Sequence, residues 1–116
     1  ETGKFYRFLF PPDCEDYPVI KHVYLYKLKD RSQAEEIAAK LLTMKDHIPS
    51  VYDVETGIDF IGAGSSFDLM ELVVCRNMDD FRAFCTDAYH DSIRAYMKDK
   101  FTEGYKVDFD DGIAAE

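Results

Sequence analysis

The segment from Val19 to Leu28 limits the choice of fold more than any other part of this sequence. Its even-numbered and odd-numbered residues are expected to face opposite sides, as successive residues of a strand do. Both sides are largely apolar, which is typical of a strand in the middle of a sheet that is covered on both faces. The even side holds Ile20, His22, Tyr24, Tyr26 and Leu28, and the odd side holds Val19, Val23 and Leu25.

An amphipathic helix is predicted to follow this strand. Ser32 and Glu35 have the spacing of a capping box, in which two side chains bond the free N–H groups of the first helical turn. Apolar residues then recur at helical spacing until Ile48-Pro49 ends the element, because a proline disfavours helical backbone in the residue before it. These apolar residues are Ala34, Ile37, Ala38, Leu41 and Leu42.

Val51–Ile61 and Ser66–Arg76 are two further predicted strands. Gly62–Ser65 joins them, and its glycines allow the positive φ angles of a hairpin loop. In the second strand, Glu71 is the carboxylate in an otherwise apolar row, and a buried carboxylate needs a partner. The other members of that row are Phe67, Leu69, Val73 and Cys75.

Two shorter helices and a last strand complete the predicted order. Asn77 and Asp87 each have the side chain of a helix N-cap, and Gly104 is expected to close the second helix. Tyr105–Asp110 then alternates apolar and polar residues, as a strand does. The order is βαββαβ, which predicts an α+β, ferredoxin-like fold with a four-stranded antiparallel sheet and helices on one face. Apolar residues on the other face are expected to be covered by a second copy of the chain, so we expect a homodimer.

The composition favours one soluble domain. At 116 residues, 47% of them hydrophobic, the chain can bury a single core without disulfides. The formal net charge of −9 would repel a phosphate backbone, so nucleic acid is not expected as a partner. No apolar run reaches the roughly 20 residues that cross a bilayer, so no membrane partner is expected either. Cys14, Cys75 and Cys85 are odd in number and lack a CxxC spacing, which favours reduced thiols and a cytoplasmic location.

Four local motifs occur in order between Val19 and Asp110: Ile20-Lys21-His22-Val23, Ile48-Pro49-Ser50-Val51, Phe67-Asp68-Leu69 and Phe84-Cys85-Thr86-Asp87-Ala88-Tyr89-His90. In sequence and in order they resemble the motifs of the stress-responsive dimeric α/β-barrel (Dabb) family. The resemblance implies a dimeric α/β barrel over residues 19–111. An N-terminal extension over residues 1–18 and a C-terminal tail over residues 112–116 would flank it.

The resemblance also implies a cavity between sheet and helices that two histidines face, here His22 and His90. A plant polyketide cyclase of this family is proposed to use a tyrosine and the second histidine for an intramolecular aldol condensation. This sequence has Phe84 at the position of that tyrosine and Leu69 at the position of another pocket histidine. The expected partner is a small apolar or aromatic molecule, and the expected chemistry is cyclisation, isomerisation or lyase action. The alternatives are a non-catalytic stress-responsive oligomer and a related barrel monooxygenase.

The residues themselves favour acid/base chemistry at His90, His22 and Glu71, which are the predicted catalytic residues. An imidazole changes charge near neutral pH, so two of them facing a cavity can move protons without a cofactor. Because the first and third strands are neighbours in this fold, Glu71 is expected to lie beside His22 and to orient it. The predicted pocket-lining residues are Tyr24, Tyr26, Leu41, Leu69, Phe81, Phe84 and Tyr89.

Each of these residues also has a purely structural interpretation. A histidine on an apolar strand face is more often a packed core residue than a catalyst, and tyrosines such as Tyr24 and Tyr26 are common core aromatics. His22, His90 and Glu71 would suit zinc or iron if they converged. Neither a metal nor a cofactor is expected, since the sequence has no glycine-rich phosphate loop and no HExxH motif.

Overall fold

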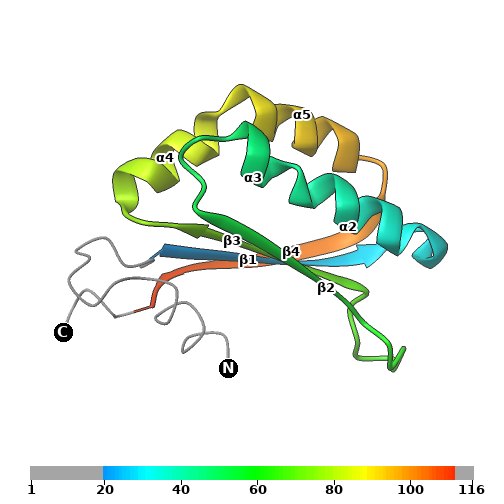
Figure 1. Ribbon diagram of the computed structural model, residues 1–116. Coiled ribbons are helices and arrows are strands. Elements are labelled where there is room, and N and C mark those ends of the chain that lie inside the picture. The colour runs from blue at the N-terminus through cyan, green and yellow to red at the C-terminus, as the bar shows by residue number, and fades with distance from the viewer. Residues whose placement is uncertain (1–19, 112–116) are drawn as a thin grey trace.

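The computed structural model describes residues 20–111; the predicted extension over residues 1–18, Val19 and the tail over residues 112–116 lie outside them. The described residues form a four-stranded antiparallel sheet with its helices on one face (Figure 1), which confirms the α+β, ferredoxin-like βαββαβ prediction. The elements are β1 (Ile20–Leu28), η1 (Arg31–Gln33), α2 (Ala34–Leu42), α3 (Met44–His47), β2 (Asp53–Ile58), β3 (Leu69–Cys75), α4 (Met78–Thr86), α5 (Ala88–Met97) and β4 (Phe101–Asp110).

The strand order in the sheet is β2-β3-β1-β4, so β1 is a central strand, as its two apolar faces predict. β1 pairs with β3 on one side and with β4 on the other, both antiparallel. The register places His22 opposite Asp108 of β4 and Tyr24 opposite Glu71 of β3. Polar side chains from three strands are therefore brought together on the face that the helices cover.

The core fills the space between that face and the helices. The even-numbered side of β1 and the odd-numbered side of β3 supply the sheet half, because alternate residues of a strand share a face. The helices supply the other half from residues at helical spacing. The largest fully buried side chains of this core are Phe84, Ile37, Leu41, Met44, Ile48, Leu69, Val73 and Cys75. Val74 is also fully buried, but it belongs to a smaller cluster with Leu72 on the opposite face of the sheet.

The two predicted N-caps of the last helices are confirmed. The Asn77 side chain accepts a hydrogen bond of 2.8 Å from the backbone N–H of Asp80, at the start of α4. The Asp87 side chain accepts one of 2.7 Å from the N–H of Tyr89, at the start of α5. Asp87 thereby ends one helix and begins the next, which fixes the first turn of α5.

The capping box predicted at Ser32 is wrong. The cap is Asp30, whose carboxylate accepts hydrogen bonds from the Ser32 N–H at 3.0 Å and from its hydroxyl at 2.6 Å. A 3₁₀ turn therefore precedes α2, and Ser32 lies within that turn instead of preceding the helix. The Asp30 carboxylate takes both the backbone N–H and the hydroxyl of the serine two residues on, so the Ser32 hydroxyl is not free to cap α2.

The predicted hairpin forms, but both of its strands are shorter than expected. β2 ends at Ile58 and β3 begins at Leu69, so the loop between them is longer than Gly62–Ser65. Arg31 holds this loop: its guanidinium donates to the Asp59 carbonyl at 2.6 Å and to the Asp68 carboxylate at 3.1 Å. These polar contacts end the pairing of β2 with β3, although the alternation of apolar and polar residues alone predicts that the strands continue.

The prediction that Gly104 closes a helix is also wrong. Gly104 lies within β4, opposite Tyr26 of β1, and α5 ends at Met97. A Cβ atom at position 104 would lie 2.6 Å from Cε1 of Tyr24, so the glycine is required for close approach of the Tyr24 ring to the strand. This ring lies on the helix-covered face of the sheet.

The opposite face of the sheet carries exposed apolar side chains. Tyr105 is 63% exposed and Val107 is 53% exposed, and Leu25 and Phe109 are also partly open to solvent. No helix within residues 20–111 covers this face (Figure 1). Within the same residues, no helix combines the length and the apolar character needed to span a bilayer.

Candidate functional site

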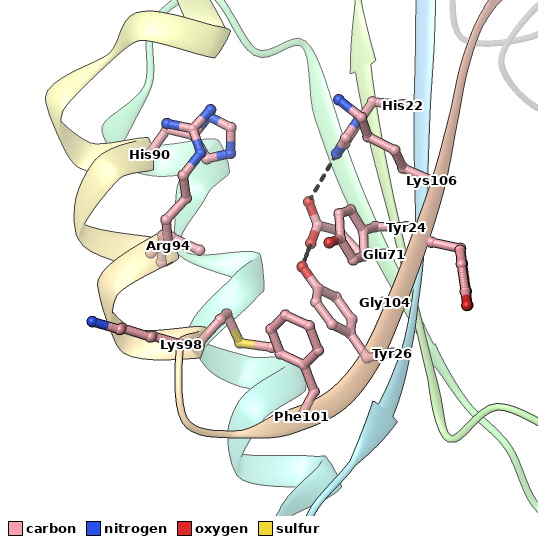
Figure 2. A pocket seen from close by; sticks show the side chains of 13 residues that line it. His22, Tyr24, Tyr26, Glu71, His90, Arg94, Lys98, Phe101, Gly104 and Lys106 are labelled. Atoms are coloured by element: carbon pink, nitrogen blue, oxygen red, sulfur yellow. Dashed lines mark hydrogen bonds and ion pairs between the residues drawn. The ribbon is translucent and has the colours of Figure 1, made fainter.

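A pocket of about 560 Å³ lies between α5 and the helix-facing side of the sheet. Figure 2 shows His90 and Arg94 on the α5 side, with His22, Glu71 and Tyr26 across from them on the sheet side. The three predicted catalytic residues thus line one pocket. Two of the predicted lining residues, Tyr24 and Tyr26, line it as well.

On the sheet side, His22 lies between two carboxylates. Its Nδ1 atom is 2.5 Å from Oδ1 of Asp108, and its Nε2 atom is 3.7 Å from Oε2 of Glu71. The other oxygen of Glu71 accepts a hydrogen bond of 2.7 Å from the Tyr26 hydroxyl. The four side chains form a continuous polar row, Asp108–His22–Glu71–Tyr26, across the three neighbouring strands β4, β1 and β3.

Burial controls the acidity of the middle of this row. Glu71 is 2% exposed. Loss of solvent raises its pKa above the usual carboxyl range, while the hydrogen bond from Tyr26 and the nearby His22 act in the opposite direction. Burial, reinforced by the Glu71 charge, also raises the pKa of Tyr26, so its hydroxyl stays protonated and acts as a donor. Glu71 therefore exchanges a proton at a higher pH than an exposed glutamate does.

On the helix side, His90 is a neutral imidazole. Its Nδ1 atom lies 3.0 Å from the carbonyl oxygen of Phe84, and because a carbonyl only accepts, this nitrogen carries the proton. Nε2 is left with a lone pair. Burial, together with the positive charge of Arg94, lowers the pKa of His90 to about 4. The ring stacks on Phe84, with centroids 4.1 Å apart.

The remaining predicted lining residues do not line this pocket. Leu41, Leu69 and Phe84 are fully buried in the core, where their side chains fill space between the sheet and the helices. Phe84 nevertheless touches both imidazoles, since it also packs edge-on against His22 at 5.6 Å between centroids. Phe81 is partly buried against the core, and Tyr89 stacks on His47 of α3 and bonds Thr43, the residue before that helix.

Sequence reasoning missed much of the pocket wall. The sequence places Asp108 only in the polar half of an alternating strand, yet its carboxylate bonds the Nδ1 atom of His22, which lines the pocket. Its signal was the alternation in the last strand, which puts polar residues on the face opposite Tyr105 and Val107. Arg94, Lys106 and Phe101 also line the pocket, and only the register between β1 and β4 and the position of α5 bring them there.

Within residues 20–111, no group of three or more His, Cys, Asp or Glu side chains is placed to hold a metal ion. His22 and Glu71 lie side by side, but His90 belongs to the other wall of the pocket (Figure 2). In the described part of the chain, the arrangement offers proton donors and acceptors on two walls rather than a set of converging ligands.

Replacing Asp87 by alanine is expected to lower the free energy of unfolding by about 1 kcal/mol, because the first turn of α5 loses its cap. His90 lies in that turn, and the break between α4 and α5 at Asp87 lets its Nδ1 atom bond the Phe84 carbonyl. Chemical denaturation measures the loss, and the imidazole resonances of His90 report its position. Asp87→Asn keeps the cap and is the matched control; equal losses in both variants would contradict this role.

The family model of the Stress responsive A/B Barrel Domain matches residues 20–111, which is the whole described part of the chain. The chain belongs to the Dabb family. No curated protein matches it. The Dabb resemblance drawn from the four sequence motifs is thus confirmed at the level of the family.

Solved structures with the same fold are similar to this Dabb chain. A dimeric ferredoxin-like protein of unknown function from Thermobifida fusca is 22% identical, with a TM-score of 0.69, over 80% of this chain and 91% of that one. A hydroxynitrile lyase from Passiflora edulis is 12% identical, with a TM-score of 0.70, over 80% and 93% of the two chains. The cofactor-independent oxygenase SnoaB from Streptomyces nogalater is 11% identical, with a TM-score of 0.62, over 78% and 89%. At these identities the likeness establishes the fold alone.

Proposed function

We propose that this Dabb protein binds a small apolar or aromatic molecule in the pocket and transfers protons to and from it. The observation that carries the proposal is that His22, Glu71 and His90 line one pocket of about 560 Å³. A volume of this size is in the usual range for small-molecule sites, which combine apolar walls with a few polar groups. Cyclisation, isomerisation and lyase action all need this kind of proton transfer.

The two walls of the pocket suit different tasks. Glu71 has a raised pKa and lies beside His22, whose other nitrogen Asp108 holds, so these residues form a row along which a proton can be passed. His90 is uncharged at neutral pH and offers a lone pair, which suits it to accept a hydrogen bond from a hydroxyl or enol group. Phe84 separates the imidazoles, so a bound molecule is needed to connect them.

The relatives support the proposal without deciding the reaction. A hydroxynitrile lyase and a cofactor-independent oxygenase share this fold, so the fold accommodates both bond-cleaving and oxygen chemistry.

The exposed apolar side chains on the uncovered sheet face support a homodimer, and a structural relative is dimeric. Free Cys75 and Cys85 support a location in the reducing cytoplasm.

Deuterium exchange into a carbon acid tests the proposed chemistry without knowledge of the natural substrate. Phenylacetone in deuterated buffer, followed by proton NMR, is expected to exchange its acidic hydrogens faster with the protein than in buffer alone. Glu71→Gln and His90→Gln are each expected to lower the protein-dependent rate about a hundredfold, the scale of general acid/base catalysis. Native mass spectrometry reports whether each variant remains a dimer of the 13.4 kDa chain.

His47→Gln is the matched control, because His47 is exposed on α3 and bonds the Thr43 carbonyl, away from the pocket. Its exchange rate is expected to equal that of the unchanged protein. Exchange no faster than in buffer, or equal in all of these proteins, would overturn the catalytic proposal. A folded dimer that binds no small molecule at all would instead favour the non-catalytic oligomer.

A further inference from the structure

The pocket has a polar end and an apolar end. In Figure 2, His90 and Arg94 on α5 face His22 and Lys106 on the sheet at one end of the view. Phe101 lies at the other end, packed edge-on against Tyr26 with centroids 5.0 Å apart. Met97 and Ile93 add further apolar surface to the lining. A molecule that fills this space therefore meets both imidazoles with one end and hydrocarbon with the other.

Two cationic side chains stand on opposite walls of the polar end. Arg94 comes from α5 and Lys106 from β4, and both are largely open to solvent at the rim. The Arg94 guanidinium bonds Asp91 at 2.6 Å and the Cys85 carbonyl at 3.0 Å, which occupies two of its five N–H donors. Lys98 also belongs to the lining, but Figure 2 shows it directed away from the imidazoles.

The charge of this lining is opposite to the charge of the chain. The chain carries −9, whereas the pocket is lined by three cationic side chains and one carboxylate, Glu71, which is buried and bonded to the Tyr26 hydroxyl. The Lys106 ammonium is 3.6 Å from Asp108, and that carboxylate is shared with His22. Asp91, the partner of Arg94, is mostly exposed to solvent, which screens its charge. A positive rim remains over a low-dielectric pocket, where attraction for an anion is strengthened.

We propose that the pocket selects organic acids. The carboxylate would lie between Arg94 and Lys106, and an aromatic or alkyl tail would lie against Phe101, Met97 and Tyr26. Arg94 still has donors for a charge-assisted bond to a carboxylate, and Lys106 supplies a second charge from the other wall. This inference rests on the proposed function and names its substrate class: a carbon acid that bears a carboxylate, with its reacting atoms beside the two imidazoles.

Calorimetric titration with cinnamate and with its uncharged amide, cinnamamide, separates the charge from the shape of the ligand. The unchanged protein is expected to bind cinnamate at least about tenfold more tightly than cinnamamide at low salt, and the advantage is expected to shrink as salt is added. The double variant Arg94→Gln, Lys106→Gln is expected to bind the two compounds equally, with its affinity for cinnamamide unchanged.

Arg82→Gln is the matched control. Arg82 forms the same kind of pair with the residue three positions earlier, Asp79, as Arg94 forms with Asp91, but it lies on α4 outside the pocket lining. It is expected to keep the full preference for cinnamate. Loss of that preference in Arg82→Gln would show that net charge alone is responsible and would overturn the inference.

The remaining outcomes distinguish this inference from the function on which it rests. Equal affinity of the unchanged protein for both compounds would overturn the selection of acids, while binding and phenylacetone exchange would still support a proton-transfer pocket. Binding of neither compound, with no phenylacetone exchange, would overturn both. A double variant that weakens both ligands equally would show that Arg94 and Lys106 only shape the pocket, which also overturns the inference.

Discussion

Replacing Glu71 by glutamine is expected to raise the free energy of unfolding at pH 8 by roughly 1–3 kcal/mol, the cost typical of a buried group without full compensation. The two side chains have nearly the same size, and the amide oxygen can still accept the hydrogen bond from Tyr26. What changes is that glutamine has no charge to bury. The same substitution is expected to slow the protein-dependent deuterium exchange into phenylacetone. Stability and activity would therefore change in opposite directions, as at many active sites.

The pH dependence of the free energy of unfolding shows whether the buried charge of Glu71 causes this difference in stability. Burial raises the pKa of Glu71 above the unfolded value near 4.5, so the folded state holds this proton more tightly than the unfolded state. The contribution of Glu71 to stability is therefore greatest below pH 4.5 and is lost as the pH rises from there through the folded pKa. Unfolding in urea is expected to give equal stabilities for the unchanged protein and Glu71→Gln at pH 4, and a difference that grows toward pH 8.

His90 changes stability in the opposite direction over part of the same range. Burial lowers its pKa to about 4, from 6.5, so its contribution is fully present above pH 6.5 and is lost as the pH falls toward 4. The free energy of unfolding of the unchanged protein depends on pH through both groups, and each single variant keeps only the dependence of the other group. As the pH rises from 4 to 6.5, the stability of Glu71→Gln is expected to increase, and the stability of His90→Gln is expected to decrease. A Glu71→Gln protein less stable at pH 8 than the unchanged protein would show that the ionised carboxylate stabilises the fold.

The central sheet was predictable because its signals are local. Alternation over nine residues identified β1, and both apolar faces marked it as central. Asn77 and Asp87 were predictable for the same reason, because a cap bonds an N–H group two or three residues away. The prediction of a cap at Ser32 failed because Asp30, two residues earlier, also has a capping side chain, and local geometry that the sequence does not specify favours Asp30.

The candidate site was predictable only where the strands supply it. Once the first and third strands are neighbours, the shared face of His22 and Glu71 follows from alternation. To predict that Asp108 contacts His22, one needs the register between β1 and β4, which depends on where the last helix ends. To predict that residues of α5 line the pocket, one needs the position of that helix over the sheet, which tertiary packing sets. Leu41 and Leu69 were predicted to line the pocket but are buried in the core. An apolar residue beside a predicted pocket is more often in the core than on the pocket wall.

Gly104→Ala is expected to lower the free energy of unfolding by about 1–3 kcal/mol, the usual cost of adding a methyl group where there is no room. The new Cβ atom would lie 2.6 Å from Cε1 of Tyr24 and 2.9 Å from Cε2 of Phe101. Neither ring can move alone, because Tyr24 stacks on Tyr26 at 4.4 Å and Phe101 packs edge-on against both tyrosines. The rings must shift together, and they form the apolar wall of the pocket.

The control for this substitution is Gly64→Ala. Nothing lies within 4 Å of a Cβ atom at position 64, so this variant is expected to unfold within about 0.5 kcal/mol of the unchanged protein. Adding Tyr24→Ala to Gly104→Ala is expected to cost less than the sum of the two single changes, because the new methyl group then has space. Strict additivity would show that the loss arises in the β1–β4 pairing rather than at the Tyr24 ring.

The same variants test whether the aromatic wall holds the tail of a ligand. Displacement of Tyr24 and Phe101 narrows the apolar end of the pocket. Gly104→Ala is therefore expected to lower the affinities for cinnamate and for cinnamamide by the same factor. Arg94 and Lys106 lie at the other end, so the preference for the acid should remain (Figure 2). Titration of both compounds into Gly104→Ala and Gly64→Ala measures this. An unchanged affinity in Gly104→Ala would place the tail elsewhere, because a ligand lying against Phe101 must respond to the movement of that ring.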